Sequence, residues 1–408
     1  MTARYNSPHQ FEPLLPSDAR QEALLSKAGD LVRAATALAG QRVPPELHVP
    51  PELHVLHVLL RSMNSYYTNR IEGQHTRPHE IEQALRKDFS ANQELAAKQR
   101  LAVAHIEAEA ALEQRYSGEA AVATLYSPQA VQDVHRELFG RLPAQDWEVN
   151  QGQTVVPGQW RDKEVSVGQH IAPAAAHVPE FLARWAQRYG SVRRGEAALV
   201  AMACAHHRLG WIHPFMDGNG RVMRLHTHLV LHALGLSNGL WSPLRGFARS
   251  QERYDLLLAE ADHTRRGDLD GRGNLSEQAL VAWADYVLDI CLDQVAFMQQ
   301  MLDFDAIKQR IEGALVYEGT VNKSGVRIES LRALHYLFLS GEELGRGEFK
   351  AMLGLRDRIA TDALGALVKR GFLRSDSPQG KVRLGLPQHV LRFLFPKLWP
   401  EAEADAVA

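Results

Sequence analysis

The sequence predicts a mainly α-helical protein that carries one β-hairpin and ends in a helix–turn–helix unit. Apolar residues recur at helical spacing over most of the chain, as in 21–40 and 276–302. Residues 152–171 break this pattern, because Val, Thr and Trp flank a Pro-Gly bend and a charged turn, which is typical of a hairpin. After residue 315, two short helical patterns, a longer helix ending near Gly371 and a glycine-containing turn at Gly380 follow in the order of a winged helix.

Composition places the chain among ordinary globular proteins. It has 408 residues, 45% of them apolar and 23% charged, with a net charge of −2, so the global charge indicates no particular partner. The two cysteines, Cys204 and Cys291, lie in apolar helical patterns and are too few for a disulfide framework or a thiolate zinc site. No apolar run reaches 18 residues and the polar N-terminus lacks a secretory pattern, so we expect a cytoplasmic protein without a membrane span.

Helical segments can be placed along the chain by periodicity and caps. We expect helices at 21–40, 55–70, 91–114, 127–140 and repeatedly between 178 and 304. Ser127 is the expected N-cap of the fourth, with Pro128 as its first residue, and Ser276 that of the longest. A tandem "PPELHV" at 44–49 and 50–55 is too short for a solenoid repeat and indicates a duplicated connector.

The segment "HPFMDGNGRVMR" at 213–224 combines the groups of a phosphoryl-transfer site. A lone Gly-Asn-Gly is usually a turn, but this one joins two apolar helical patterns. It therefore lies at a helix N-terminus, where backbone N–H groups and the helix dipole bind anions. Arg221 and Arg224 lie three residues apart and face the same side. Asp217 can hold Mg²⁺ on phosphates, and His213 can accept a proton near neutral pH.

This segment resembles the signature of the Fic family, His-Pro-Phe-x-Asp/Glu-Gly-Asn-Gly/Lys-Arg-x-x-Arg, at every defined position. The resemblance implies an N-terminal helical region over 1–110, a Fic catalytic core over 111–305 and a C-terminal winged-helix domain over 315–408. It also implies transfer of AMP from ATP to a Ser, Thr or Tyr hydroxyl of a target protein and of the enzyme itself.

The resemblance assigns a role to each residue of the signature. His213 would deprotonate the hydroxyl and Asp217 would hold Mg²⁺. Gly218, Asn219 and Gly220 would bind phosphate oxygens, with Asn219 adding a side-chain donor, and Arg221 and Arg224 would balance β- and γ-phosphate charge. Phe215 would anchor the loop in the core, and Tyr254 would lie near the nucleotide, although a core tyrosine is an equal alternative.

The hairpin at 152–171 resembles the flap with which the family binds target segments by β-augmentation, and a plain structural hairpin is the alternative. Its predicted target-binding residues are Gly158, Trp160, Arg161 and Val165.

"TNRIEG" at 68–73 resembles the family's inhibitory motif, Ser/Thr-x-x-x-Glu-Gly/Asn, on a helix of about 56–73. Thr68 and Glu72 are four residues apart and so share a helix face, and Gly73 suits the end of the helix. The resemblance implies an ion pair between Glu72 and Arg224 that keeps ATP in an unproductive pose. A second "RIEG" at 310–313 fails the motif, because Lys308 stands where Ser or Thr is required.

Other functions remain open at this stage. Residues 344–385 contain nine basic and four acidic side chains, so the winged helix could bind DNA or protein, with the Fic core as a sensor. In some relatives the inhibitory glutamate assists removal of AMP, so Glu72 could serve the reverse reaction. Homodimers occur in the family but have no signature here. The many histidines form no H-E-x-x-H pattern, and 268–279 lacks the carboxylates of a calcium loop.

Overall fold

The computed structural model describes residues 5–40, 53–149, 153–168, 170–192, 194–396 and 398. The first "PPELHV" copy, the first half of the second, and residues 152 and 169 of the predicted hairpin lie outside the described residues. Within the described part, no helix is long and apolar enough to cross a membrane.

The chain divides into two compact units where the sequence predicts three domains. The first contains residues 1–39 and 64–296, and the second contains 40–63 and 297–408. The first unit includes most of the expected N-terminal region, because α4 (Gln93–Arg115) packs against α6 (Pro128–Phe139) and α9 (Asn219–Ala233). The second unit takes up the chain again at residue 297, and the division into three domains stays a prediction.

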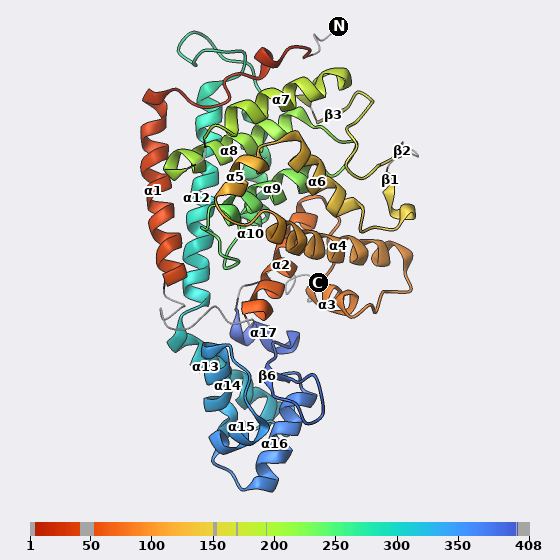
Figure 1. The fold of residues 1–408 in the computed structure, drawn as a ribbon, viewed down its shortest axis with the longest axis vertical. Helices are drawn as coiled ribbons and strands as arrows, with labels where there is room; N and C mark the ends of the chain where they lie inside the picture. The colour runs from red at the N-terminus through yellow and green to blue at the C-terminus, as the bar shows by residue number, and fades with distance from the viewer. Residues whose placement is uncertain are drawn as a thin grey trace. The chain divides into compact units, whose positions relative to one another are not determined.

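The centre of the first unit is the helix pair α8 (Gly195–Ile212) and α9, joined by residues 213–218 (Figure 1). Nearly every residue of α8 is buried, which fits its apolar sequence on all sides. The helices α7 (Val178–Tyr189), α6, α5 (Ala120–Leu125) and α4 surround this pair. The loop between α8 and α9 is therefore held from both ends by the core.

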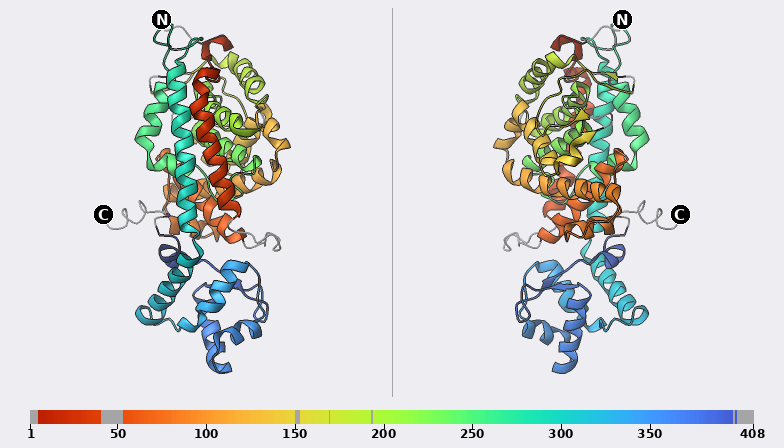
Figure 2. Two further views of the ribbon diagram at one scale, coloured as in Figure 1. Left: turned by 90° about the vertical axis from the view of Figure 1, so that its left-hand side faces the viewer. Right: turned by 90° about the vertical axis from the view of Figure 1, so that its right-hand side faces the viewer.

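Further helices complete the first unit. α1 (Asp18–Gly40) runs beside α12 (Glu277–Met301), as Figure 2 shows, and Lys27 Nζ lies 2.6 Å from Asp289 Oδ1. Also present are α2 (Leu53–Ile71, which begins in the second unit), α3 (Pro78–Leu85), α10 (Leu244–Arg249) and α11 (Gln251–Glu260), with the 3₁₀ turns η1 (Pro8–Phe11), η2 (Ala144–Trp147) and η3 (Ala175–His177). The predicted N-caps are confirmed, since Ser127 Oγ accepts from Ala130 N at 3.1 Å and Ser276 Oγ from Ala279 N at 3.1 Å.

The predicted single hairpin at 152–171 is wrong. Two separate ladders occur: β1 (Glu148–Val149) pairs with β2 (Gln153–Thr154), and β3 (Ser166–Val167) pairs with β4 (His170–Ile171). The Pro157-Gly158 bend lies between them and joins no paired strands. The reason is that backbone donors in this stretch bond to the core, Gly158 N to His135 Nδ1 at 2.8 Å and Arg161 N to Pro214 O at 2.9 Å.

The second unit contains α13 (Phe304–Val316), a π-helical turn η4 (Tyr317–Val321), η5 (Ile328–Ser330), α14 (Leu331–Ser340), α15 (Arg346–Leu353), α16 (Asp357–Lys369), β5 (Leu373–Arg374), β6 (Arg383–Leu384) and α17 (Gln388–Leu394). β5 and β6 pair, and Leu344 forms a bridge with Val382. This order of elements is the expected one, whereas the winged-helix function stays a prediction.

Acidic partners reduce the positive charge of the second unit. Arg370 pairs with the buried Glu318 at 2.7 Å, Arg383 with Asp376 at 2.6 Å, and Lys350 with Asp357 at 2.6 Å. Three of the nine basic residues counted in the sequence are thus paired with carboxylates within the unit, which leaves fewer positive charges for DNA phosphates. Binding of DNA stays a prediction.

Candidate active site

Two left-handed residues define the ends of the 213–218 loop. α8 ends at Ile212 because His213 adopts φ 49° and ψ 62°, and α9 begins after Gly218, which has φ 78°. A Cβ at Gly218 would lie 2.4 Å from Phe139 Cε2, so both the backbone conformation and the close packing require glycine there.

The middle of the loop is fastened to the core by Phe215 and Asn219. Phe215 is fully buried, as predicted, and stacks on His135 with ring centroids 3.8 Å apart. The Asn219 side chain accepts from Phe215 N and donates to Phe215 O, both at 2.9 Å. The Asn219 amide therefore clamps the backbone of the loop, and its contact with a phosphate stays a prediction.

His213 places a partly buried imidazole at the start of the loop. Burial is the main cause that lowers the pKa of His213 to about 4, and the charges of His170 and Arg161 act in the same direction. The imidazole is therefore neutral near pH 7. Its backbone is fixed by the Arg161 side chain, whose Nε donates to His213 O at 2.7 Å.

The N-terminus of α9 presents donors to an anion. Gly218 supplies no side-chain cap to this helix, so the backbone N–H groups of its first turn face the loop. Arg221 is buried beside them and bonds to Asp217 Oδ2 at 3.2 Å and to Gln74 Oε1 at 3.3 Å. Its Nε has no hydrogen-bond partner among the described residues. This orphan donor and the helix terminus together suit a phosphate group.

Arg224 is occupied by the end of α2. Its Nε donates to Thr68 Oγ1 at 2.9 Å, and one terminal nitrogen bonds to Glu72 Oε1. Burial alone would raise the pKa of the Glu72 carboxyl, but the charges of Arg224 and Arg221 outweigh it and hold the pKa below its usual value. Glu72 is therefore ionised, and the ion pair expected from the motif is present in the structure.

A Schellman motif places Glu72. Gly73 has φ 68°, Gln74 N bonds to Asn69 O at 2.8 Å, and Gly73 N bonds to Arg70 O at 3.0 Å. Gln251 Nε2 donates to Ile71 O at 3.2 Å and satisfies another terminal carbonyl. The predicted helix end at Gly73 is confirmed.

Tyr254 is buried close to Arg224. Its side chain is 1% exposed, and its hydroxyl lies 3.0 Å from His206 Nε2. The charge of Arg224 also acts on the phenol group. The predicted contact of Tyr254 with the nucleotide stays a prediction.

The predicted flap residues separate into two groups. Arg161 and Gly158 are buried: Arg161 Nη1 donates to Lys163 O at 2.9 Å, and Gly158 O accepts from Gln132 Nε2 at 3.0 Å. Their polar groups therefore bond within the chain, and their contact with a target stays a prediction. Trp160 and Val165 remain partly exposed. Trp160 lines a pocket together with Thr154, Val155, Val156, Gln159, Asp162, Lys163 and Met216 of the loop.

His135 is the main site residue that sequence reasoning missed. Its Nδ1 accepts from Gly158 N, so Nε2 carries the proton and donates to Asp217 O at 3.3 Å. Burial lowers the pKa of His135 to about 3. The uncharged His135 side chain therefore connects α6 to residues 157–161 and to the 213–218 loop. In the sequence, its apolar neighbours on α6 indicate that it is buried, but no residue pattern indicates these hydrogen bonds.

The helical core and its loop match a known family over part of the chain. Residues 125–231 match the Fic/DOC family model, so the chain contains a Fic domain over these residues. It is similar to "Protein adenylyltransferase Fic" of Drosophila mojavensis, with 30% identity over 104 residues, and to that of Culex quinquefasciatus, with 31% over 106 residues. Each match covers 25% of this chain and 19% of the relative, so the chain spans about a fifth of the length of these relatives.

A solved structure shares the fold. A Fic family protein from Desulfovibrio desulfuricans G20 superimposes with a TM-score of 0.52 and 18% identity, covering 91% of this chain and 98% of that one. At this identity the likeness concerns the fold.

Proposed function

We propose that this chain transfers AMP from ATP to a Ser, Thr or Tyr hydroxyl of a target protein and of itself, and that Glu72 inhibits the transfer. The curated relatives named protein adenylyltransferase support the reaction class over the quarter of the chain they match. The observation that carries the proposal is the Glu72–Arg224 ion pair beside a neutral His213 at a helix N-terminus.

The reaction follows from the charges of the loop. Neutral His213 accepts the proton of the target hydroxyl, and the hydroxyl oxygen forms a bond to the α-phosphorus. The bond from that phosphorus to the bridging oxygen of pyrophosphate breaks, and pyrophosphate carries the electron pair away. The N–H groups of α9 and the orphan Nε of Arg221 are the donors we assign to the phosphate oxygens.

Mg²⁺ suits the Asp217 carboxylate. This side chain is 36% exposed at the loop, and one of its oxygens pairs with Arg221 at 3.2 Å. Mg²⁺ prefers one or two carboxylates together with phosphate oxygens and water, which an exposed carboxylate beside an anion site offers. Bound there, the ion would supply positive charge that balances the triphosphate.

Inhibition follows from competition for Arg224. The Arg224 side chain is 1% exposed, and both Thr68 and Glu72 accept hydrogen bonds from it. A γ-phosphate would have to displace an ionised carboxylate from it, which costs more than binding to a vacant arginine. ATP then binds with its triphosphate in another pose, in which the α-phosphorus is not in line with His213.

The test is incubation with ATP labelled at the α-phosphate. We expect strong self-labelling of Glu72→Ala, weak labelling of wild type and none of Glu72→Ala/His213→Ala. The matched control is Glu312→Ala, because the exposed Glu312 stands in the same "RIEG" sequence but belongs to the second unit. If Glu72→Ala labels no faster than wild type, inhibition by Glu72 is refuted, and labelling that survives loss of His213 refutes the proton acceptor.

A further inference from the structure

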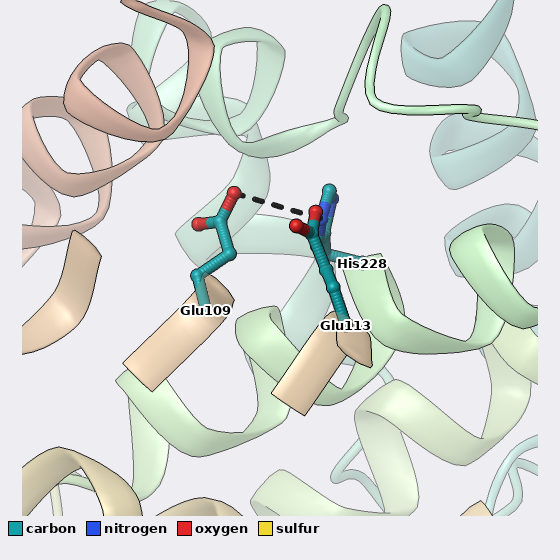
Figure 3. Close-up of side chains that lie close together, drawn as sticks. All are labelled: Glu109, Glu113 and His228. Atoms are coloured by element: carbon teal, nitrogen blue, oxygen red, sulfur yellow. Dashed lines mark hydrogen bonds and ion pairs between the residues drawn. The ribbon is translucent and has the colours of Figure 1, made fainter. Parts of the chain in front are cut away.

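Three buried ligand-type side chains meet between α4 and α9. Glu109 and Glu113 lie one turn apart on α4, and His228 reaches them from α9, as Figure 3 shows. One ligand atom from each falls within 4.8 Å of the others. Their exposed fractions are 1%, 6% and 2%, so all three have lost nearly all contact with solvent.

The spacing of these atoms fits one ion. His228 Nε2 lies 2.8 Å from Glu113 Oε1 and 3.6 Å from Glu109 Oε1. Ligand atoms at about 2.1 Å from a tetrahedral ion lie about 3.4 Å from one another. Small side-chain rotations would therefore let all three bind a single centre.

The types of donor also suit a cation. Two buried carboxylates one turn apart on α4 and an imidazole from α9 are groups that divalent transition metals take as ligands in proteins.

A second histidine points to a missing ligand. His105 lies one turn before Glu109 on α4 and is 1% exposed. Neither ring nitrogen has a hydrogen-bond partner among the described residues, and Nδ1 lies 3.6 Å from Glu109 Oε2. A buried imidazole without a partner is unfavourable, and an ion bound to Glu109 would supply one.

Surrounding groups orient the ligands as metal sites require. Asn64 Nδ2 donates to Glu109 Oε1 at 2.8 Å, and Ser242 Oγ lies 3.2 Å from His228 Nδ1. When His228 Nε2 binds a metal, Nδ1 carries the proton and donates to Ser242, which fixes the ring.

We propose that Glu109, Glu113 and His228 bind a divalent transition-metal ion of the Zn²⁺ class, with His105 as the fourth ligand. The set of two oxygens and one or two imidazole nitrogens favours Zn²⁺ over Ca²⁺ and Mg²⁺, which take more oxygens or keep several waters. The site is separate from Asp217. Its ligands come from two helices more than a hundred residues apart in the sequence, so no local sequence motif indicates the metal site.

The proposed centre links the helix of Glu72 to the helix of Arg224. Asn64, which holds Glu109, lies one turn before Thr68 on α2, and His228 lies one turn after Arg224 on α9. An ion at the centre therefore tightens the packing of α2 on α4 and α9. Its removal should speed amide exchange in residues 64–71, a readout that does not depend on catalysis.

The test uses the full chain after treatment with a chelator. The protein is mixed with Zn²⁺, desalted, and its metal content and Tm are measured. We expect about one Zn²⁺ per chain in wild type and a Tm several degrees above that of the chelated protein. Asp217→Asn should keep this ion, which separates it from the nucleotide site. Slower exchange of residues 64–71 should accompany binding.

Two variants locate the ion. Glu113→Gln preserves the shape of the side chain, and His228→Gln removes the nitrogen ligand, so each should lower the retained Zn²⁺ at least tenfold. The control Glu107→Gln changes an exposed carboxylate of α4 and should retain it. Circular dichroism checks that each variant folds. If Glu113→Gln and His228→Gln do not fold, His105→Asn tests the site, because it leaves the three other ligands intact and should weaken Zn²⁺ binding. Wild type that retains no Zn²⁺ and shows no shift in Tm overturns the proposal, as does equal retention in folded Glu113→Gln.

Discussion

The Glu72 carboxylate lies directly against Gly220 of the catalytic loop. A Cβ placed on Gly220 would come within 2.2 Å of Glu72 Oε1, and within 3.1 Å of the Arg224 guanidinium. Glu72 thus covers the first turn of α9 as well as pairing with Arg224. The inhibitory contact and the proposed phosphate site share the same backbone, so ATP in a productive pose and Glu72 compete for space and for charge.

The Schellman motif at Gly73 can be tested against an equivalent motif elsewhere. Gly235 ends α9 with the same pair of bonds and φ 70°, and a Cβ at either glycine meets nothing within 4 Å. Alanine at either position should cost roughly 1 kcal/mol of unfolding free energy, because only the left-handed backbone is strained. Urea denaturation of both variants measures this.

Self-labelling distinguishes the two glycines. Gly73→Ala should label faster than wild type, since straining the end of α2 loosens Glu72, whereas Gly235→Ala should not. Equal labelling by the two variants would show that the geometry of the α2 end does not control the site.

Thr68 contributes to stability through Arg224. Thr68→Val keeps the shape but removes the acceptor of Arg224 Nε, so the buried guanidinium loses a hydrogen bond. We expect a loss of about 1–3 kcal/mol in unfolding free energy, measured in urea at pH 7. The control is Thr361→Val, where the hydroxyl bonds to Asp357 O on an exposed surface and the change should stay within about 0.5 kcal/mol. A Thr68→Val protein as stable as the control would argue that the 2.9 Å contact adds nothing.

Local features of the site were predictable because they depend on short sequence spans. The two helices, the left-handed Gly218 and the end of α2 at Gly73 follow from periodicity and backbone preferences, and Phe215 is buried as expected. The pair of Glu72 with Arg224 followed only from a family motif, since nothing in 68–73 itself indicates which arginine it meets.

Features that depend on tertiary packing were missed or misassigned. The 152–171 segment has hairpin composition, yet its backbone bonds to His135 and Pro214, a competition that no local pattern reveals. Asn219, at the start of α9, and Arg161, in a loop, are polar residues that the sequence suggests as ligand or target contacts. In the structure their side chains satisfy buried carbonyl and N–H groups of the 213–218 loop.

Buried neutral histidines should make the protein less stable in mild acid. Burial lowers the pKa of His135 to about 3 and that of His226 to about 4, against an ordinary value near 6.5 in the unfolded chain. Between these values the unfolded chain binds more protons, so the unfolding free energy falls as the pH drops below about 6.5.

At pH 5 each of these two histidines should account for a loss of about 1–2 kcal/mol relative to pH 7, measured by urea denaturation. His226 Nε2 donates to Leu125 O at 2.9 Å, a bond that the amide of glutamine can replace. His226→Gln should therefore show a smaller loss between pH 7 and pH 5 than wild type. An identical loss in both proteins would mean that His226 is not held neutral.

The role of Asn219 decides whether the catalytic loop is preformed. A residue that only bound phosphate would leave the stability of the nucleotide-free protein unchanged when truncated. Asn219→Ala instead removes both partners of Phe215 N and Phe215 O, two backbone groups of a buried residue, and should cost about 2–4 kcal/mol without any nucleotide present. Asn219→Asp keeps the acceptor for Phe215 N and should lose less than the alanine variant. Urea denaturation of the three proteins measures this order. If nucleotide-free Asn219→Ala is as stable as wild type, Asn219 does not stabilise the loop, and its role is limited to phosphate binding.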